Sequence, residues 1–206
     1  MPKVVLYYHP SRELNAFNNV KVYHDSFKND NQDPYLWNDQ FLHSFCHITQ
    51  SSNDIEQINF WVSSDETRKK MNKLYCDLVF VISEKHFWNH KNSIDRNEHF
   101  IDNDYCYDEH YNKFGCHLFK RKKRYSLKAD PIKSFQPQDN DRNLMDILPF
   151  LNSLGILTET LQEGMKAGFN SKPYKLNDNV TSELYKYLDQ SQIKLIGRDL
   201  KKLRFE

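Results

Sequence analysis

Short apolar, β-prone runs predict strands in the first two thirds of the chain. Residues 4–8, 58–62 and 77–82 are short runs rich in β-branched and aromatic side chains, and each predicts a strand. The run 77–82 is apolar on both faces, which is typical of a central strand. Residues 125–129 alternate between apolar and polar side chains, which predicts a half-buried strand.

Helical spacing replaces strand spacing in the last third. Apolar residues recur three and four positions apart between Leu144 and Leu151, and again over 158–166 and 180–188, so three helices are predicted there. Residues 193–196 predict a final strand. An earlier short helix is predicted over 67–75, because two serines and two acids precede it.

Strands therefore come first and helices follow, which is the pattern of an α+β fold. We expect a curved mixed or antiparallel sheet, with flanking helices and C-terminal helices packed against it. The length of 206 residues suits a single structural unit. Within it we expect a β-rich part over residues 1–140 and a helical part over 141–206.

Composition narrows the class of protein. The chain carries 28% charged residues and a formal net charge of +1, so it is not a polycation. No apolar stretch approaches the length of about 18 residues that a membrane span needs. The first residues contain no long apolar stretch after their charge, so we expect no signal peptide and a cytoplasmic protein with reduced thiols and no membrane partner. Neither GxGxxG nor GxxxxGKS/T occurs, which argues against a glycine-rich phosphate loop.

Charge is segregated along the chain despite the near-zero total. Residues 95–110 are acidic, whereas basic side chains dominate 120–133 and 194–204. Such a basic segment focuses a positive field, and phosphates are its commonest target. The alternative is a set of solvated loops that pair with one another. The phosphate-binding candidates form one unbroken run: Lys120, Arg121, Lys122, Lys123 and Arg124.

Aromatic residues surround this basic run. Trp61 lies at the end of one predicted strand, Trp88 follows the central one, and Tyr111 lies in the long polar connection before the basic run. A site that reads an exposed base needs aromatic faces for stacking together with cations for the backbone. We therefore name these three residues as base-binding candidates. The alternative is ordinary packing near strand ends.

Metal and catalytic chemistry have weaker support. The densest group of metal-ligating residue types is Cys106, His110, Cys116 and His117, but it lacks the two tight pairs of a zinc site. We therefore expect no metal and no cofactor. Asp104 and His110 are the catalytic candidates if the chain is a metal-dependent enzyme. The chain has no GxSxG motif, no zinc-binding HExxH motif and no nucleophile signature for cysteine, which favours binding over catalysis.

The order of elements resembles the PUA-like superfamily, which includes ASCH, EVE and YTH domains and bacterial nucleotide-modification-associated domains. The matching segments are 58–62, 67–75, 77–88 and 117–129, and Asp77-Leu78-Val79-Phe80 is similar to a step common in those barrels. Cys76 stands where those domains usually have glycine. The resemblance implies a small, strongly curved barrel that recognises nucleic acid, often a modified base. In bacteria such domains are often linked to phage defence or base modification.

Three functions follow from these patterns. The first is a nucleic-acid-binding protein that combines an aromatic pocket with a basic strand and takes DNA, RNA or a nucleotide as its partner. The second is a metal-dependent enzyme that acts on nucleic acid or nucleotides. The third is a protein-interaction effector that docks through a tyrosine- and phenylalanine-rich surface.

Overall fold

The computed structural model of the chain describes residues 3–8, 13–17, 20–24, 55–88, 124–130, 132–165 and 174–196, and the structural statements below concern these residues. They form nine strands, three α-helices and one 3-10 turn. The strands are β1 (Lys3–Tyr8), β2 (Glu13–Phe17), β3 (Val20–His24), β4 (Ile55–Ser64), β5 (Leu74–Trp88), β6 (Arg124–Ala129), β7 (Gln136–Gln138), β8 (Tyr174–Leu176) and β9 (Ile193–Leu195). The helices are α2 (Leu148–Ser153), α3 (Thr158–Gly164) and α4 (Asp178–Asp189), and the 3-10 turn is η2 (Arg68–Lys70).

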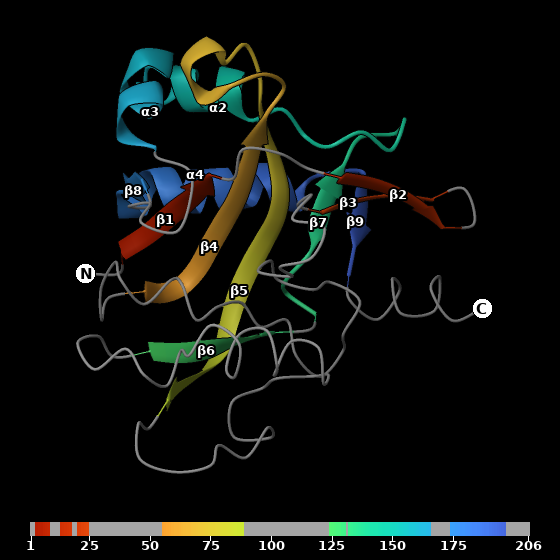
Figure 1. Cartoon of the computed structure of the whole chain (residues 1–206), viewed down its shortest axis with the longest axis vertical. Helices are drawn as coiled ribbons and strands as arrows, with labels where there is room; N and C mark the ends of the chain where they lie inside the picture. The colour runs from red at the N-terminus through yellow and green to blue at the C-terminus, as the bar shows by residue number, and fades with distance from the viewer. Residues whose placement is uncertain are drawn as a thin grey trace.

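The main sheet has five strands in the order β6-β5-β4-β1-β8 (Figure 1). Strand β1 pairs with β4 in parallel, whereas the β4–β5, β5–β6 and β1–β8 pairs are antiparallel. Strands β2 and β3 form a separate antiparallel pair, as do β7 and β9. The α+β class and the mixed sheet are thus as the sequence predicted.

Helix α4 crosses behind β1, β4 and β5 and covers that face of the sheet (Figure 1). Its buried residues Val180, Leu184 and Leu188 recur every four positions and so form one apolar stripe. They join a core to which the sheet contributes Leu6 and Phe60, both without exposed surface. Burying each such side chain contributes about 1.5–3 kcal/mol, so this contact stabilises the sheet.

Strand β5 is the longest strand described, with 15 residues, and it changes partners along one edge. Near its start, Val79 forms an antiparallel bridge with Phe135, which precedes β7. Further along the same edge, the β6 ladder runs from the pair Ile82–Ala129 to the pair Trp88–Arg124. Strand β5 therefore pairs both with β6 and with the segment around Phe135, which follows β6 in the sequence.

The helix predicted over 67–75 is wrong, because the structure has only the 3-10 turn η2 and β5 already begins at Leu74. Backbone pairing with a distant segment explains the difference. The Ile147 N–H donates to the Leu74 carbonyl over 2.7 Å, and the Cys76 N–H donates to the Met145 carbonyl over 3.0 Å. These tertiary hydrogen bonds override a weak local helix propensity.

The same pairing shortens the helix predicted from Leu144. Leu144 and Asp146 lie in antiparallel bridges to Gln138 and Tyr75, so α2 begins only at Leu148. Residues after 141 also supply strands as well as helices, since Leu176 of β8 pairs with Val4 of β1. None of the described helices is long and apolar enough to cross a membrane.

Helix α2 ends in a Schellman motif that depends on glycine. Gly155 has a φ of +83°, its N–H donates to the Asn152 carbonyl, and the Ile156 N–H donates to the Leu151 carbonyl. Nothing lies within 4 Å of a Cβ built on Gly155, so only backbone conformation opposes a side chain there.

We predict that Gly155→Ala lowers the free energy of unfolding by about 1 kcal/mol, because alanine is strained at positive φ. Urea unfolding followed by circular dichroism would measure the change. Gly155→Asn is the matched control and should lose less, since asparagine tolerates this conformation. Equal stability of the alanine variant and the wild-type protein would contradict the assigned role.

Candidate ligand-binding site

Trp61 lies in the interior of the protein. Its exposed fraction is 8%, and its backbone pairs with Leu78 of β5. Its alternation with Phe60 and Val62 places it on the sheet face opposite α4. Buried polar residues share that face, where the Ser63 hydroxyl donates to Asp77 Oδ1 over 3.0 Å. Trp61 therefore offers little surface to a base.

Trp88 is the last residue of β5 and stands opposite Arg124, the first residue of β6. The backbone register thus brings a predicted stacking residue beside the end of the predicted basic run. Trp61 does not join them, because its partner Leu78 precedes Trp88 by roughly ten residues, or about 33 Å of extended strand. The two tryptophans do not attach to the same part of the sheet.

The other predicted site residues lie outside the described part of the chain. They are Tyr111, the basic residues Lys120, Arg121, Lys122 and Lys123, the catalytic candidates Asp104 and His110, and the metal-ligating candidates Cys106, Cys116 and His117. Within the described residues, no group of three or more histidine, cysteine, aspartate or glutamate side chains is arranged to hold a metal ion.

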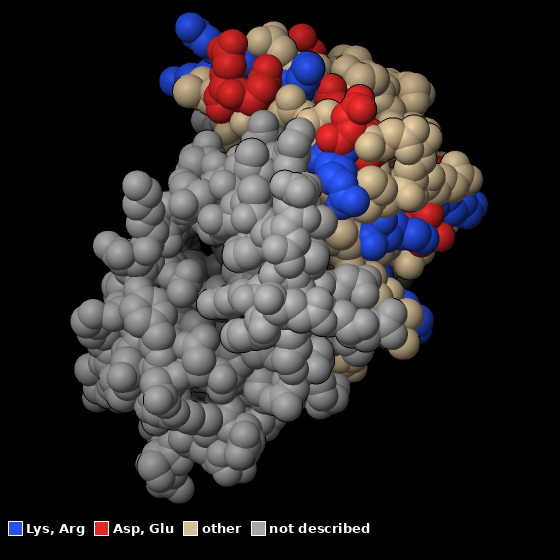
Figure 2. All heavy atoms as spheres, turned by 90° about the vertical axis from the view of Figure 1, so that its right-hand side faces the viewer, with Lys and Arg blue, Asp and Glu red and all other residues tan. Residues whose placement is uncertain are grey.

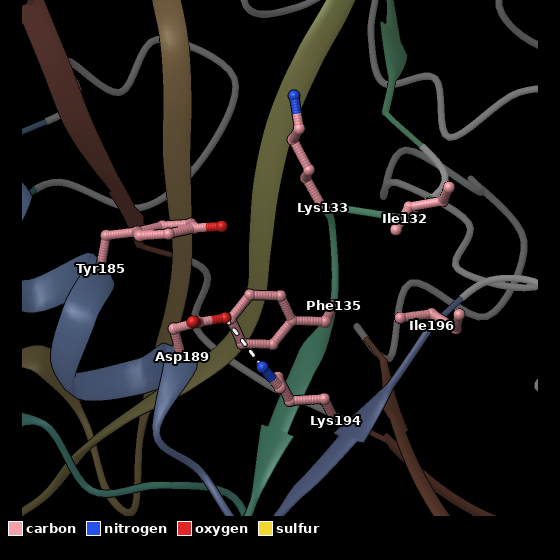
Figure 3. A pocket seen from close by; sticks show the side chains of 7 residues that line it. All are labelled: Ile132, Lys133, Phe135, Tyr185, Asp189, Lys194 and Ile196. Atoms are coloured by element: carbon pink, nitrogen blue, oxygen red, sulfur yellow. Dashed lines mark hydrogen bonds and ion pairs between the residues drawn. The ribbon is translucent and has the colours of Figure 1, made fainter.

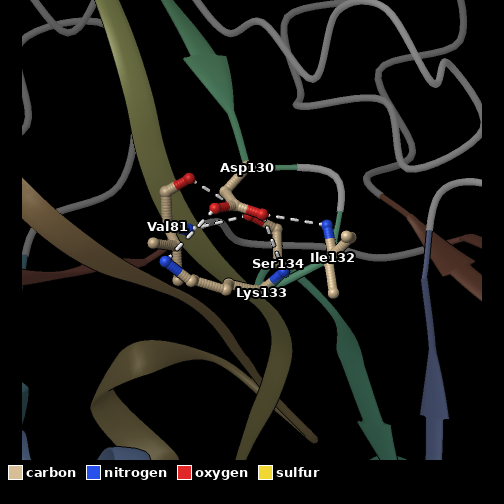
Figure 4. Close-up of polar contacts among 5 residues, drawn as sticks. All are labelled: Val81, Asp130, Ile132, Lys133 and Ser134. Atoms are coloured by element: carbon tan, nitrogen blue, oxygen red, sulfur yellow. Dashed lines mark hydrogen bonds and ion pairs between the residues drawn. The ribbon is translucent and has the colours of Figure 1, made fainter.

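A tight turn follows β6 and returns the chain to β5 (Figure 4). Asp130 organises it, since Asp130 Oδ1 accepts hydrogen bonds from the backbone N–H groups of Ile132 and Lys133, each over 3.0 Å. The Lys133 ammonium lies 3.6 Å from Asp130 Oδ2. Partial burial acts to raise the pKa of Asp130, but these hydrogen bonds and the Lys133 charge outweigh it and lower that pKa.

Ser134 completes the turn and forms hydrogen bonds to the β5 backbone at the point where β5 stops pairing with Phe135 and begins to pair with β6. Its hydroxyl accepts from the Val81 N–H over 2.9 Å and donates to the Val81 carbonyl over 3.2 Å. The same carbonyl accepts from the Asp130 N–H over 2.7 Å. A side chain with no exposed surface thus provides the hydrogen-bond acceptor for the Val81 N–H.

The turn leads directly into a pocket of about 180 Å³ that lies between β7, β9 and α4 (Figure 3). The buried ring of Phe135 forms one wall, and Tyr185 of α4 meets it edge-on with ring centroids 6.2 Å apart. We call this the Phe135 pocket. Its lining residues are Ile132, Lys133, Phe135, Tyr185, Asp189, Lys194 and Ile196.

Two cations stand at this pocket. Lys194 pairs with Asp189 over 2.8 Å, and its ammonium lies 5.4 Å from the centroid of the Phe135 ring (Figure 3). Burial raises the pKa of Tyr185, the Asp189 charge adds to the effect, and Lys194 opposes it. The Tyr185 hydroxyl therefore stays protonated at neutral pH and serves as a neutral hydrogen-bonding group.

The pocket joins two basic segments that are distant in sequence. Lys133 closes the segment 120–133 and Lys194 opens the segment 194–204. Elsewhere on the described part of one face, basic and acidic side chains are interspersed (Figure 2). Attraction of an anion to that part must therefore come from local groups of cations and not from a broad field.

Sequence reasoning missed the centre of this pocket. Both lysines belong to basic segments of the sequence, but nothing in the sequence pattern links the two residues. Phe135 and Tyr185 gave no functional signal, because one lies in a short polar stretch and the other beside a helical apolar stripe. Only the pairing of β7 with β9, which sets Pro137 opposite Lys194, brings the elements together.

We predict that Ser134→Ala lowers the free energy of unfolding by about 1–3 kcal/mol, because it leaves the Val81 N–H without its hydrogen bond in the interior. Urea unfolding measures the change. Ser153→Ala is the matched control, since the Ser153 hydroxyl bonds to the Phe150 carbonyl at an exposed site and should cost much less. Similar losses in both variants would argue against the bridging role of Ser134.

A pH dependence follows from the lowered pKa of Asp130. Its ionised form stabilises the turn above the unfolded-state pKa of about 3.9, and this contribution disappears as the pH falls through the lower folded-state pKa. We predict that Asp130→Asn is less stable than the wild-type protein near pH 6, by less than about 1 kcal/mol because the group is partly solvated. The two proteins should converge toward pH 2. A difference that is constant with pH would refute this assignment.

The pocket therefore combines the aromatic ring of Phe135, the phenol of Tyr185 and the ammonium groups of Lys133 and Lys194. Together these groups suit an anion that carries a ring. No family model, no curated protein and no solved structure matches this chain.

Proposed function

We propose that this chain binds nucleic acid, with a single base ring in the Phe135 pocket and phosphates on Lys133, Lys194 and the basic run 120–124. The observation that carries the proposal is that Lys133 and Lys194, from the two basic segments, line one pocket whose wall is an aromatic ring. Cations for the backbone and an aromatic surface for a base are the two requirements of single-strand recognition.

The dimensions of the pocket suit one ring. Its volume of about 180 Å³ is close to that of an engineered cavity of about 150 Å³ that binds benzene. The ring of Phe135 supplies apolar contact, and the Tyr185 hydroxyl supplies a hydrogen bond to a base edge. A pyrimidine fills this space, or one end of a purine does.

The cations are available for phosphate because their present pairs are weak. The Lys133 and Lys194 side chains are 67% and 39% exposed, and each pairs with one carboxylate. Exposed pairs of this kind contribute about 0–1 kcal/mol. A phosphate can therefore replace the carboxylate at small cost and form a charge-assisted hydrogen bond.

Strand β6 connects this pocket with the second predicted cluster. Its six residues span about 20 Å, from Arg124 beside Trp88 to Ala129 next to the Asp130 turn. We propose that single-stranded nucleic acid runs along β6, with its phosphates on residues 120–124 and a further base near Trp88. In this proposal Trp61 has no direct role, because it is buried.

The same proposal includes the kind of base that is recognised and the cellular role of the protein. The antiparallel β4–β5–β6 part is compatible with the resemblance to PUA-like domains over residues 58–130, and on that likeness we propose recognition of a modified base by a cytoplasmic protein of phage defence or nucleotide modification. The enzyme alternative rests on Asp104 and His110, which lie outside the described residues.

We predict that a labelled single-stranded oligonucleotide binds with an affinity that falls steeply with salt concentration. Each phosphate contact contributes about 0.7 to the logarithmic salt slope, so the double variant Lys133→Ala plus Lys194→Ala should flatten it by about 1.4. Fluorescence anisotropy over a salt series measures both slopes.

Lys186→Ala is the control, because Lys186 is an exposed lysine of α4 that pairs with Glu183 outside the pocket. It should leave the slope unchanged. Tyr185→Phe should weaken binding without altering the slope, since it removes a hydroxyl and no charge. A flat salt response in the wild-type protein would disprove the proposed function.

A further inference from the structure

A second and larger pocket lies on the other side of α4. Its volume is about 540 Å³, within the range of about 300–1,000 Å³ of small-ligand sites. Tyr187 lines it, two residues from Tyr185 and so about 200° around the helix. We call it the Tyr187 pocket. Its lining residues are Lys73, Tyr75, Asp139, Asn143, Leu144, Met145, Asp146 and Tyr187.

Backbone hydrogen bonds fix the frame of this pocket. Tyr75 and Asp146 form an antiparallel bridge between β5 and the segment that precedes α2. The Cys76 N–H donates to the Met145 carbonyl on one side of that bridge, and the Ile147 N–H donates to the Leu74 carbonyl on the other. The side chains of Tyr75, Met145 and Asp146 therefore project from a paired and rigid backbone.

Asp146 is held with one carboxylate oxygen occupied. Its Oδ1 accepts from the backbone N–H groups of Leu74 and Leu148, each over 3.1 Å. Among the described residues, Oδ2 accepts no hydrogen bond. An orientation fixed by two backbone donors thus presents one charged acceptor, which suits an N–H donor of a ligand.

The other carboxylate of the pocket is already engaged. Asp139 Oδ1 accepts from the Asn143 backbone N–H over 2.8 Å, and Asp139 Oδ2 accepts from Asn143 Nδ2 over 3.3 Å. Of the two carboxylates, Asp146 is therefore the one whose Oδ2 can accept a hydrogen bond from a ligand. The two residues provide a matched comparison within one pocket.

Aromatic surface and a cation complete the lining. Tyr187 stacks on Phe150 with ring centroids 4.2 Å apart and an interplanar angle of 8°, which fixes the plane of its ring. Burial raises the pKa of Tyr187, with a further contribution from the Asp146 charge, so the phenol is neutral. Lys73 is exposed at the rim, and its ammonium makes no ion pair within the described part of the chain.

We propose that the Tyr187 pocket binds a mononucleotide whose base carries an exocyclic amino group. The amino group donates to Asp146 Oδ2, the base lies against Tyr75 and Tyr187, and the phosphate pairs with Lys73. A base that presents a carbonyl at the same position places an acceptor against the carboxylate, and the pocket rejects it. This site is separate from the Phe135 pocket and does not depend on the proposed function.

Two pairs of ligands that differ mainly in this group test the specificity. By isothermal titration calorimetry, CMP should bind at least about tenfold tighter than UMP, and AMP at least about tenfold tighter than IMP, because a hydrogen bond to a charged group is at stake. Equal affinities within both pairs, or no binding of any of the four nucleotides at millimolar concentration, would overturn the proposal.

Asp146→Asn is the decisive variant. Asparagine keeps an Oδ1 acceptor for the Leu74 and Leu148 N–H groups, but it replaces Oδ2 with an amide donor. The preference should therefore reverse toward UMP and IMP. Asp139→Asn should change each affinity less than about threefold, because both Asp139 oxygens already serve Asn143. A loss of binding in Asp146→Asn without any reversal, in a variant that folds normally, would refute the assigned contact.

Two further comparisons test the phosphate contact and the class of ligand. Lys73→Ala should weaken CMP but leave cytidine unchanged, whereas equal effects on both ligands would disprove the phosphate contact. Arginine that competes with CMP and binds more tightly would mean that the pocket takes a guanidinium group, contrary to the proposal.

The double variant Lys133→Ala plus Lys194→Ala should leave CMP binding intact, because both lysines line the Phe135 pocket. Failure of nucleotide binding at the Tyr187 pocket and failure of oligonucleotide binding are therefore distinguishable.

Discussion

The described fold depends on how the backbone of β5 remains hydrogen-bonded where it changes partner. At Val81 the strand leaves Phe135 and meets the end of β6, and neither neighbour supplies a regular ladder bond there. The Ser134 hydroxyl takes both roles, as acceptor for the Val81 N–H and donor to its carbonyl. Without it, the Val81 N–H would lose its hydrogen bond at a cost of about 1–3 kcal/mol, whereas the Val81 carbonyl would keep the bond from the Asp130 N–H. The turn that positions Ser134 also positions its sequence neighbours Lys133 and Phe135, which line the Phe135 pocket. The pairing of β5 and the Phe135 pocket therefore depend on the same turn.

Local patterns predicted the elements that consist of a continuous β-prone run or of one apolar helix face. The strands at 4–8, 58–62 and 77–82 and the helix at 180–188 were confirmed, because such a run indicates a buried strand and four-residue spacing indicates one buried helix face. The helix at 67–75 was wrong because long-range backbone pairing at Leu74 and Cys76 is not encoded in neighbouring residues. Propensity decides only where tertiary hydrogen bonds do not.

The candidate site was less predictable than the fold for a similar reason. Lys133 and Lys194 could be recognised as parts of basic segments, but their meeting depends on the β7–β9 pair, whose strands have three residues each. Trp61 was misleading because a tryptophan near a strand end looks alike whether it faces solvent or the interior. Asp146 gave no sequence signal, since its importance comes from two backbone donors that arrive from β5 and α2.

The position of β1 has a consequence for how the chain acquires its structure. This strand lies between β4 and β8, so Val5 and Leu6 gain their second partners only when Lys175 and Tyr174 are present. Such pairing has high contact order, and the entropy of closing so long a loop must be overcome before it yields any stabilisation. During synthesis the β8 edge of β1 therefore stays open until residues 174–176 have left the ribosome. Assembly of the sheet should then be slow, and the exposed edge of β1 is the place where premature association would begin.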